Sequence, residues 1–283
     1  MSEHDNTSPT PTDSHAETPL VWAHLPTVRD RLRAADGLLF GTDFDGTLSP
    51  IEEDPEAPEP TAENLRSLRT LRDHPQVRPA VISGRGLADL RQRVGVEGVD
   101  YVGNHGLELG IDGKRETHPD AETAEPKIAE ICETLGRRLT EIEGTVVENK
   151  GVTATIHYRM VDREAVETVR EHVFEAVDER GEDEVEIHEG KESLELRPAA
   201  DWDKGSAISQ LQAHVDGWQP LYIGDDTTDE AAFEAISPNG ITVHVGDSET
   251  VADYRVRSSA EAEVFIRWVV TDGLALLAAD VEP

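Results

Sequence analysis

The sequence predicts an α/β fold, a doubly wound parallel sheet that carries a smaller inserted α+β domain. Three apolar runs of strand length, at 38–41, 77–82 and 220–223, each end in a polar cluster and precede a helix-like segment. Strands that alternate with helices in this way are typical of parallel sheets. Between the second and third runs the pattern changes to a helix and two strands, repeated once. That change indicates an antiparallel sheet with helices on one face.

The chain begins with a polar stretch, residues 1–17, that is rich in Ser, Thr, Pro and acidic residues. We expect it to be a disordered tail, and it has no apolar core of the kind that a secretory signal needs. The first strand, at 38–41, leads into a proline-rich loop and a helix at 62–71. The second strand follows at 77–82. Parallel sheets bind ligands at the carboxyl ends of their strands, so the polar clusters should converge there.

The inserted segment and the return to the main sheet complete the order of elements. The insert is expected to hold a helix at 125–142, strands at 145–148 and 153–157, a helix at 163–178, and strands at 185–188 and 193–196. A helix from 203 to about 214, the third strand and a helix at 230–236 follow. The segment 264–279 is interrupted by charge and too short to span a bilayer, so it predicts a closing amphipathic helix. The predicted domains are a core at 18–113 and 197–283 and an insert at 114–196.

The formal net charge of -33 and pI near 4.5 argue against nucleic-acid or anionic-membrane partners, which require a basic face. Acidic residues are spread along the whole length, and only five lysines occur. This composition is typical of a protein from a salt-accumulating halophile, because molar salt screens self-repulsion over a Debye length of about 3 Å. An ordinary protein with one acidic tail fits the pattern poorly. Cys132 is the only cysteine, so no disulfide can form within the chain, and a cytoplasmic location is expected.

The first strand ends in two carboxylates, Asp43 and Asp45, followed by a glycine. This pattern suits phosphoryl transfer through an aspartyl phosphate, with Asp43 as nucleophile and Asp45 as general acid and base. The alternative is an ordinary turn built from Asp and Gly. The second strand ends in Ser83, Gly84 and Arg85, where a hydroxyl and backbone amides can face a phosphate. Here the alternative is a helix N-cap serine.

Lys204 lies in the first turn of a predicted helix, where it opposes the helix dipole. A bound phosphate would make that position favourable; the alternative is a solvated surface lysine. The third strand ends in a group of hard oxygen ligands that contains Asp225, Asp226 and Asp229. Such groups suit Mg2+. Acidic residues also favour helix starts, but one helix start does not need three of them.

The first motif resembles that of the haloacid dehalogenase superfamily, and the chain resembles trehalose-6-phosphate phosphatases in particular. The residues that carry this closer resemblance are 103–108, 148–150, 157–159, 190–191, 194–198, 224–226 and 228–230. The resemblance implies that Ser83 binds phosphoryl oxygens and that Mg2+ is held by Asp43, Asp225 and the backbone carbonyl of Asp45. It implies supporting positions for Asp226 and Asp229. The insert then corresponds to a mobile cap over the sugar.

The resemblance also implies a set of substrate-binding residues. These are Asp43, Phe44, Asp45, Gly84, Arg85, His105, Glu148, Lys150, His157, Arg159, Lys191 and Glu195. Glu148, Lys150 and Glu195 offer the mixture of donors and acceptors that sugar hydroxyls require. His157 and Arg159 contact the substrate or only structure the cap, and Lys191 faces the phosphate when the cap closes. The alternative for this set is a salt-bridged polar sheet face.

The function expected on these grounds is the Mg2+-dependent hydrolysis of trehalose 6-phosphate to trehalose and phosphate, in trehalose biosynthesis. The enzyme would act after a separate trehalose-6-phosphate synthase and would have neither nucleic-acid nor membrane partners. Two alternatives stay open. One is another sugar-phosphate phosphatase of the superfamily, acting on sucrose phosphate or on mannosyl or glucosyl phosphoglycerate. The other is a non-catalytic sensor of sugar phosphates.

Overall fold

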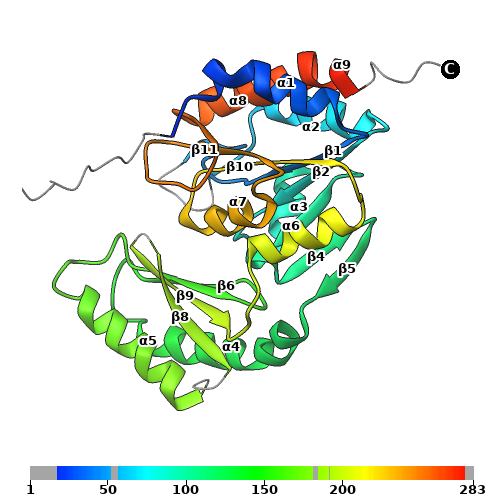
Figure 1. The fold of residues 1–283 in the computed structure, drawn as a ribbon. Coiled ribbons are helices and arrows are strands. Elements are labelled where there is room, and N and C mark those ends of the chain that lie inside the picture. The colour runs from blue at the N-terminus through cyan, green and yellow to red at the C-terminus, as the bar shows by residue number, and fades with distance from the viewer. Residues whose placement is uncertain (1–17, 52–56, 181–183, 191, 278–283) are drawn as a thin grey trace, which may run out of the picture.

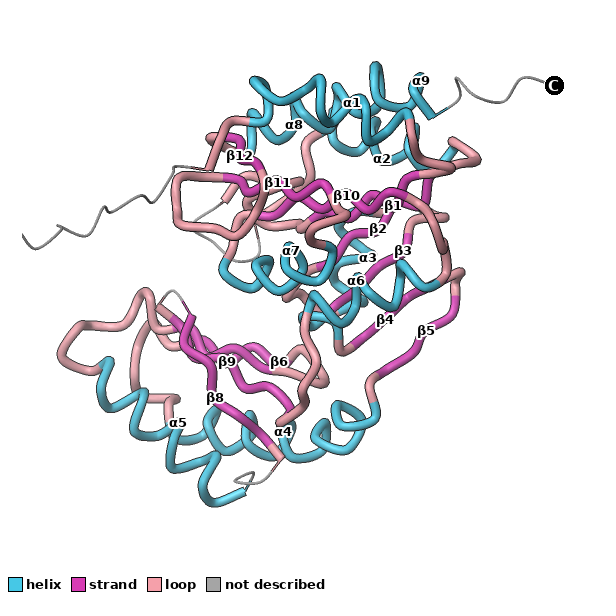
Figure 2. Tube along the Cα trace, viewed as in Figure 1, coloured by secondary structure: helices cyan, strands magenta, loops and turns pink. Residues whose placement is uncertain are grey.

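The computed structural model describes residues 18–51, 57–180, 184–190 and 192–277. The predicted tail, residues 1–17, and the candidate residue Lys191 lie outside these ranges. Within these ranges the chain forms two separate sheets, one of eight strands and one of four (Figures 1 and 2). No helix in the described part of the chain is long and apolar enough to cross a membrane.

The larger sheet has the strand order β12-β11-β10-β1-β2-β3-β4-β5. Its strands are β1 (Leu38–Thr42), β2 (Val77–Ile82), β3 (Asp100–Gly103), β4 (Glu108–Ile111), β5 (Lys114–Thr117), β10 (Gln219–Gly224), β11 (Ile241–Val245) and β12 (Tyr254–Val256). From β12 to β3, each pair of adjacent strands is parallel. The three strands predicted from apolar runs are confirmed as β1, β2 and β10, which are adjacent in the sheet. Their carboxyl ends therefore bring the three polar clusters together.

Helices cover both faces of this sheet, as the apolar sequences of its central strands require. The helices are α1 (Leu25–Arg33), α2 (Ala62–Asp73), α3 (Leu87–Val94), α6 (Lys204–Ala213), α7 (Glu230–Ile236), α8 (Ser259–Trp268) and α9 (Leu274–Leu277). Short helical segments are η1 (Val21–His24), η2 (Asn104–Gly106), η3 (Thr227–Asp229) and a π-helical turn, η4 (Val269–Gly273). Helices α6 and α7 share one apolar cluster, whereas α1, α2, α3, α8 and α9 contribute to the cluster on the opposite face.

The smaller sheet is antiparallel throughout and has the order β6-β7-β9-β8. It consists of β6 (Val146–Asn149), β7 (Ala154–His157), β8 (Val185–Gly190) and β9 (Ser193–Pro198), with α4 (Pro119–Arg138) and α5 (Val166–Arg180). Both helices pack on one face through a single apolar cluster. The other face is turned toward α6, α7 and the larger sheet (Figures 1 and 2). The predicted α+β insert is thus confirmed as a separate antiparallel layer.

The larger sheet is mostly parallel, as predicted, and the pairs β3–β4 and β4–β5 are antiparallel. The predicted start of the insert at residue 114 needs correction. Residues 114–117, assigned to the insert, form β5 and pair with β4, so the insert begins after this strand. A tight turn at Asp112 and Gly113, both with positive φ, closes the hairpin. The exposed, charged side chains of β5 suit a strand at the edge of a sheet.

Candidate active site

Asp43 leaves the end of β1 at the point where the central strands meet. Its backbone N–H donates to the carbonyl of Ile223 in β10 (2.8 Å), which continues the parallel pairing by one residue. Its carboxylate is buried, and its Oδ1 accepts a hydrogen bond from Lys204 Nζ (2.9 Å). The same amine donates to Asp229 Oδ1 (2.7 Å). A single lysine therefore connects the end of β1 with the residues that follow β10.

Lys204 is not a solvated surface lysine, since its side chain is only 2% exposed. It begins α6, whose N-terminus is capped by Asp203 through a hydrogen bond from the Ser206 amide (2.8 Å). Burial lowers the pKa of Lys204, but the two carboxylates outweigh burial and raise it overall. The amine is therefore held charged beside Asp43, which is what stabilising negative charge on a transferred group requires.

Asp229 is itself fixed by a residue that we did not predict. Tyr222, fully buried in β10, donates its hydroxyl to Asp229 Oδ1 (2.7 Å), while the Asp226 amide donates to Oδ2 (3.0 Å). The Tyr222 ring lies against Gly41, where an added Cβ would lie 2.7 Å from the ring. The sequence hides this tyrosine inside an apolar run, so only the hydroxyl distinguishes it from an ordinary core residue.

Asp225 approaches Asp43 from the end of β10 because Gly46 leaves room for it. A Cβ on Gly46 would lie 2.1 Å from Asp225 Oδ2, and Gly46 has a φ of 75°. Asp43, Asp225 and Asp229 each offer an oxygen, and these oxygens lie within 4.8 Å of one another. Asp225 Oδ1 is buried and has no hydrogen-bond partner among the residues described. The group fits a hard divalent cation such as Mg2+, which prefers carboxylate oxygens.

The electrostatics of this group favour the binding of a cation. Burial, with the carboxylates of Asp229 and Asp226, raises the pKa of Asp225 to about 7, although Lys204 opposes the change. Burial also raises the pKa of Asp43, with a further contribution from Asp229 and Asp225, and Lys204 acts in the opposite direction. A bound cation would favour the ionised form of both aspartates.

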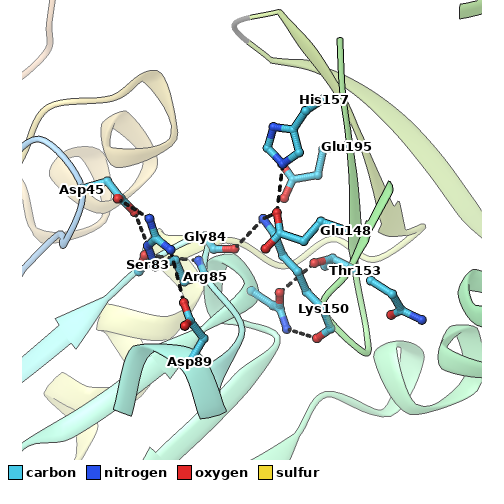
Figure 3. Close-up of polar contacts among 12 residues, drawn as sticks. Asp45, Ser83, Gly84, Arg85, Asp89, Glu148, Lys150, Thr153, His157 and Glu195 are labelled. Carbon is cyan, nitrogen blue, oxygen red and sulfur yellow. Dashed lines mark hydrogen bonds and ion pairs between the residues drawn. The ribbon is translucent and has the colours of Figure 1, made fainter. Parts of the chain in front are cut away.

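Asp45 is paired with Arg85 in this structure (Figure 3). Arg85 Nη2 and Nε donate to Asp45 Oδ1 and Oδ2, both at 2.8 Å. The same guanidinium lies over the ring of buried Phe44, 5.3 Å from its centroid, and also contacts Asp89 (3.2 Å). Ser83 is buried beside this pair, and its hydroxyl oxygen accepts a hydrogen bond from the backbone N–H of Arg85 (3.2 Å). Asp45, Ser83 and Arg85 are thus brought together just after β1 and β2, which are adjacent strands.

His105 connects the larger sheet with the smaller one. Its Nε2 lies 3.0 Å from Glu195 Oε1 and 3.0 Å from Arg197 Nη2, both on β9. The ring packs on Gly84, where a Cβ would come within 2.5 Å of it. Burial lowers the pKa of His105 in spite of the Glu195 carboxylate. Burial alone would raise the pKa of Glu195, but its pairing with His105, Lys150 and Arg197 lowers it well below the ordinary value.

Glu148 and Lys150 lie at the end of β6, facing the second polar cluster (Figure 3). Lys150 Nζ donates to the Gly84 carbonyl (3.4 Å) and lies 4.0 Å from Glu148 Oε2. Glu148 Oε2 also pairs with His157 Nε2 (2.9 Å). Burial would raise the pKa of Glu148, but the bond to His157 and the charge of Lys150 lower it overall. Arg159 is placed differently, on the surface with Glu192 (3.1 Å).

The turn after β3 explains how the two sheets are held together. Asn104 and His105 both have positive φ, 48° and 57°, which is unusual for residues other than glycine. Asn104 Oδ1 accepts the Thr153 hydroxyl (2.7 Å), and its Nδ2 donates to Glu108 Oε2 (2.6 Å). Trp202 Nε1 donates to the Gly106 carbonyl (2.8 Å). Asn104 therefore bridges the larger sheet and the smaller one.

Comparison with known proteins identifies the family. Residues 41–262 match the model of the trehalose-phosphatase family, a range that includes every group described above. The chain belongs to the trehalose-phosphatase family. It is 38% identical over 259 residues to a trehalose-phosphate phosphatase of Mycobacterium marinum and 37% identical over 269 residues to one of Mycobacterium tuberculosis. These alignments cover 86% and 89% of this chain but only 65% and 66% of the relatives.

Solved structures agree with the family assignment. The C-terminal domain of Candida albicans trehalose-6-phosphate phosphatase superposes with a TM-score of 0.73 at 25% identity, over 91% of this chain and 99% of that domain. A haloacid dehalogenase-like hydrolase from Bacteroides thetaiotaomicron matches at a TM-score of 0.55 and 17% identity, over 82% of this chain and 99% of that one. At that identity the second match shows the fold alone. The haloacid dehalogenase-like fold expected from the first motif is therefore confirmed.

Proposed function

We propose that this protein is a Mg2+-dependent phosphatase that hydrolyses trehalose 6-phosphate to trehalose and phosphate. One observation carries the proposal: the buried Lys204 donates hydrogen bonds to both Asp43 and Asp229. Beside it, Asp225 Oδ1 has no partner among the described residues. A buried aspartate with a charged amine and a cation site beside it is equipped for attack on a phosphate monoester. Membership of the trehalose-phosphatase family supports the choice of substrate.

Asp43 is the proposed nucleophile. A carboxylate oxygen of Asp43 attacks phosphorus, the bond between phosphorus and the sugar oxygen breaks, and an aspartyl phosphate forms. Lys204 keeps Asp43 oriented and balances the charge that gathers on the phosphoryl oxygens. The hydroxyl of Ser83 and the amides after β2 bind the same oxygens.

Asp45 is the proposed general acid and base. It gives its proton to the departing sugar oxygen, then takes one from a water molecule that attacks the aspartyl phosphate and releases inorganic phosphate. Both carboxylate oxygens of Asp45 are bound by Arg85 in this structure, so this pair must open during turnover. The phosphoryl group offers Arg85 a new anionic partner as it arrives.

Mg2+ would be held by Asp43, Asp225 and the backbone carbonyl of Asp45, and Asp226 and Asp229 would support these ligands. When bound, it would supply positive charge to the phosphoryl oxygens. Asp229 is suited to support and not to direct binding, because its Oδ1 already accepts from both Lys204 and Tyr222.

The smaller sheet is the proposed cap, residues 114–196 by sequence and 118–198 once β5 is excluded and β9 is taken to its end. Its face toward the larger sheet carries Glu148 and Glu195, whose carboxylates can accept hydrogen bonds from sugar hydroxyls. Lys150 and His157 lie beside them. For Lys191 the role of closing on the phosphate stays a prediction. A separate trehalose-6-phosphate synthase would supply the substrate in a cytoplasmic pathway.

The test is phosphate release from a panel of substrates at high salt, with and without Mg2+. The panel contains trehalose 6-phosphate, sucrose phosphate, glucosyl and mannosyl phosphoglycerate, and glucose 6-phosphate. We expect the highest kcat/KM for trehalose 6-phosphate and loss of activity in a chelator. A higher kcat/KM for another member of the panel would identify that compound as the substrate in place of trehalose 6-phosphate. Tight binding of trehalose 6-phosphate without phosphate release would instead identify a sensor.

A further inference from the structure

A row of polar side chains crosses the smaller sheet from one strand to the next. In the register of the sheet, Glu148 of β6 lies opposite Thr155 of β7, and Thr155 lies opposite Glu195 of β9. The row ends at His188 of β8, which lies opposite Glu195. Glu148 and Glu195 do not lie on adjacent strands. They are separated by β7, and Thr155 occupies the position between the two carboxylates.

Thr155 is on the face of the sheet that is turned toward the active site. Its neighbours along the strand, Ala154 and Ile156, pack in the apolar cluster with α4 and α5. Successive side chains of a strand point to opposite faces, so Thr155 points away from these helices. Glu195, directly opposite on β9, reaches His105 of the larger sheet from this same face.

The hydroxyl of Thr155 is the unsatisfied member of the row. Thr155 is 6% exposed, and its Oγ1 is buried with no hydrogen-bond partner in the described part of the chain. The flanking groups are engaged: Glu148 pairs with His157 (2.9 Å), and Glu195 pairs with His105 (3.0 Å). Most buried hydroxyl groups in proteins have a partner. A methyl group in place of this hydroxyl would fill the same position in the strand with no polar atom to satisfy.

We propose that Thr155 is a substrate-binding residue whose hydroxyl bonds a hydroxyl group of the sugar between Glu148 and Glu195. This inference rests on the proposed function and adds a residue that determines affinity for the sugar and not for the phosphate. A threonine hydroxyl both donates and accepts, as does each sugar hydroxyl. Strands about 4.8 Å apart place the three side chains within reach of one sugar unit. When a bound sugar draws the carboxylates of Glu148 and Glu195 toward itself, the Oγ1 of Thr155 between them becomes accessible.

The test compares Thr155→Val with Thr155→Ser. Valine keeps the shape and the β-branch but removes the hydroxyl, and serine keeps the hydroxyl. For Thr155→Val we expect the KM for trehalose 6-phosphate and the inhibition constant of free trehalose to rise about three- to tenfold. The inhibition constant of inorganic phosphate should stay at the wild-type value. Thr155→Ser should lie within about twofold of wild type on all three measures.

Thr145→Val is the matched control, because Thr145 also has a buried Oγ1 without a partner in the described residues. It lies before β6 and outside the row, so its KM should equal that of wild type. An unchanged KM in Thr155→Val overturns the inference, as does an equal rise in the phosphate and trehalose constants. If wild type itself fails to hydrolyse trehalose 6-phosphate, the proposed function falls and this inference with it. If wild type turns over and Thr155→Val is normal, the inference alone falls.

Discussion

Tyr222 acts on the pair formed by Lys204 and Asp43 through a hydrogen bond to Asp229. Its hydroxyl supports Asp229, and Asp229 supports the lysine. Tyr222→Phe keeps the ring and removes this donor, so we expect kcat to fall about three- to tenfold with little change in KM. Tyr101→Phe is the control, because the Tyr101 hydroxyl is also buried and bonds only the backbone of Val96 in the residues described. Equal kcat values in the two variants would contradict the positioning role of Tyr222.

Asp225 makes the metal affinity of the site depend on pH. Its pKa of about 7 means that protons compete with Mg2+ for the carboxylate below neutral pH. The increase in Tm caused by Mg2+ should therefore be larger at pH 8 than at pH 5.5, where the ionised fraction is small. Asp225→Asn should remove the increase at both pH values. A Mg2+ effect that is equal at both pH values in wild type would argue against Asp225 as a ligand.

The residues that carry charge could be predicted, but their partners could not. Asp43, Lys204 and Asp225 stand out because carboxylates and a scarce lysine follow apolar runs. Thr155 and Tyr222 do not, since a threonine and a tyrosine are ordinary residues in strands. The pairing of Asp45 with Arg85 joins residues 40 positions apart and depends on the order of strands, which local sequence does not specify.

Two separate features favour a glycine in the turn after β1. Gly46 has a φ of 75°, and a Cβ there would lie 2.1 Å from Asp225 Oδ2. Gly113 has a φ of 76°, but nothing lies within 4 Å of its Cβ position. Both glycines can be replaced by alanine, and both changes should cost about 1 kcal/mol of stability from the backbone. The displacement of Asp225 should occur in Gly46→Ala alone.

The measurement is Mg2+-dependent activity and Tm for both variants. Gly113→Ala should keep wild-type kcat and Mg2+ response, while Gly46→Ala should lose at least about tenfold in kcat/KM. Similar activities in the two variants would show that the contact between the β1 turn and Asp225 is unimportant.

The elements themselves were largely predictable where the pattern is strong. The helix at 230–236 is found as α7, and the apolar runs before Asp43, Ser83 and Asp225 are all strands. The prediction missed the antiparallel hairpin of β4 and β5, because four-residue strands contain too few positions to show a period. The register that places Thr155 between two glutamates is set by contacts across strands and is invisible in any one of them.

The net charge of -33 dominates the electrostatics of the whole molecule. Repulsion among carboxylates opposes the compact state and is screened as salt is added. We expect the Tm to rise steadily as KCl increases from about 0.1 M, where the Debye length is about 10 Å, to about 1 M, where it is about 3 Å. Sucrose at the same osmolality is the control for solvent exclusion. Full stability and activity in dilute buffer would contradict the halophilic interpretation.

Asp43 is proposed to form a covalent phosphate during the hydrolysis of trehalose 6-phosphate. The most direct measurement is a rapid acid quench of a single turnover with Mg2+ at high salt, followed by mass spectrometry of the peptide that contains Asp43. The proposed function predicts a transient phosphoryl group on Asp43, absent in Asp43→Asn, which should fold but not turn over. Hydrolysis of the substrate with no phosphoryl group on this residue, or turnover in Asp43→Asn close to wild type, would contradict it.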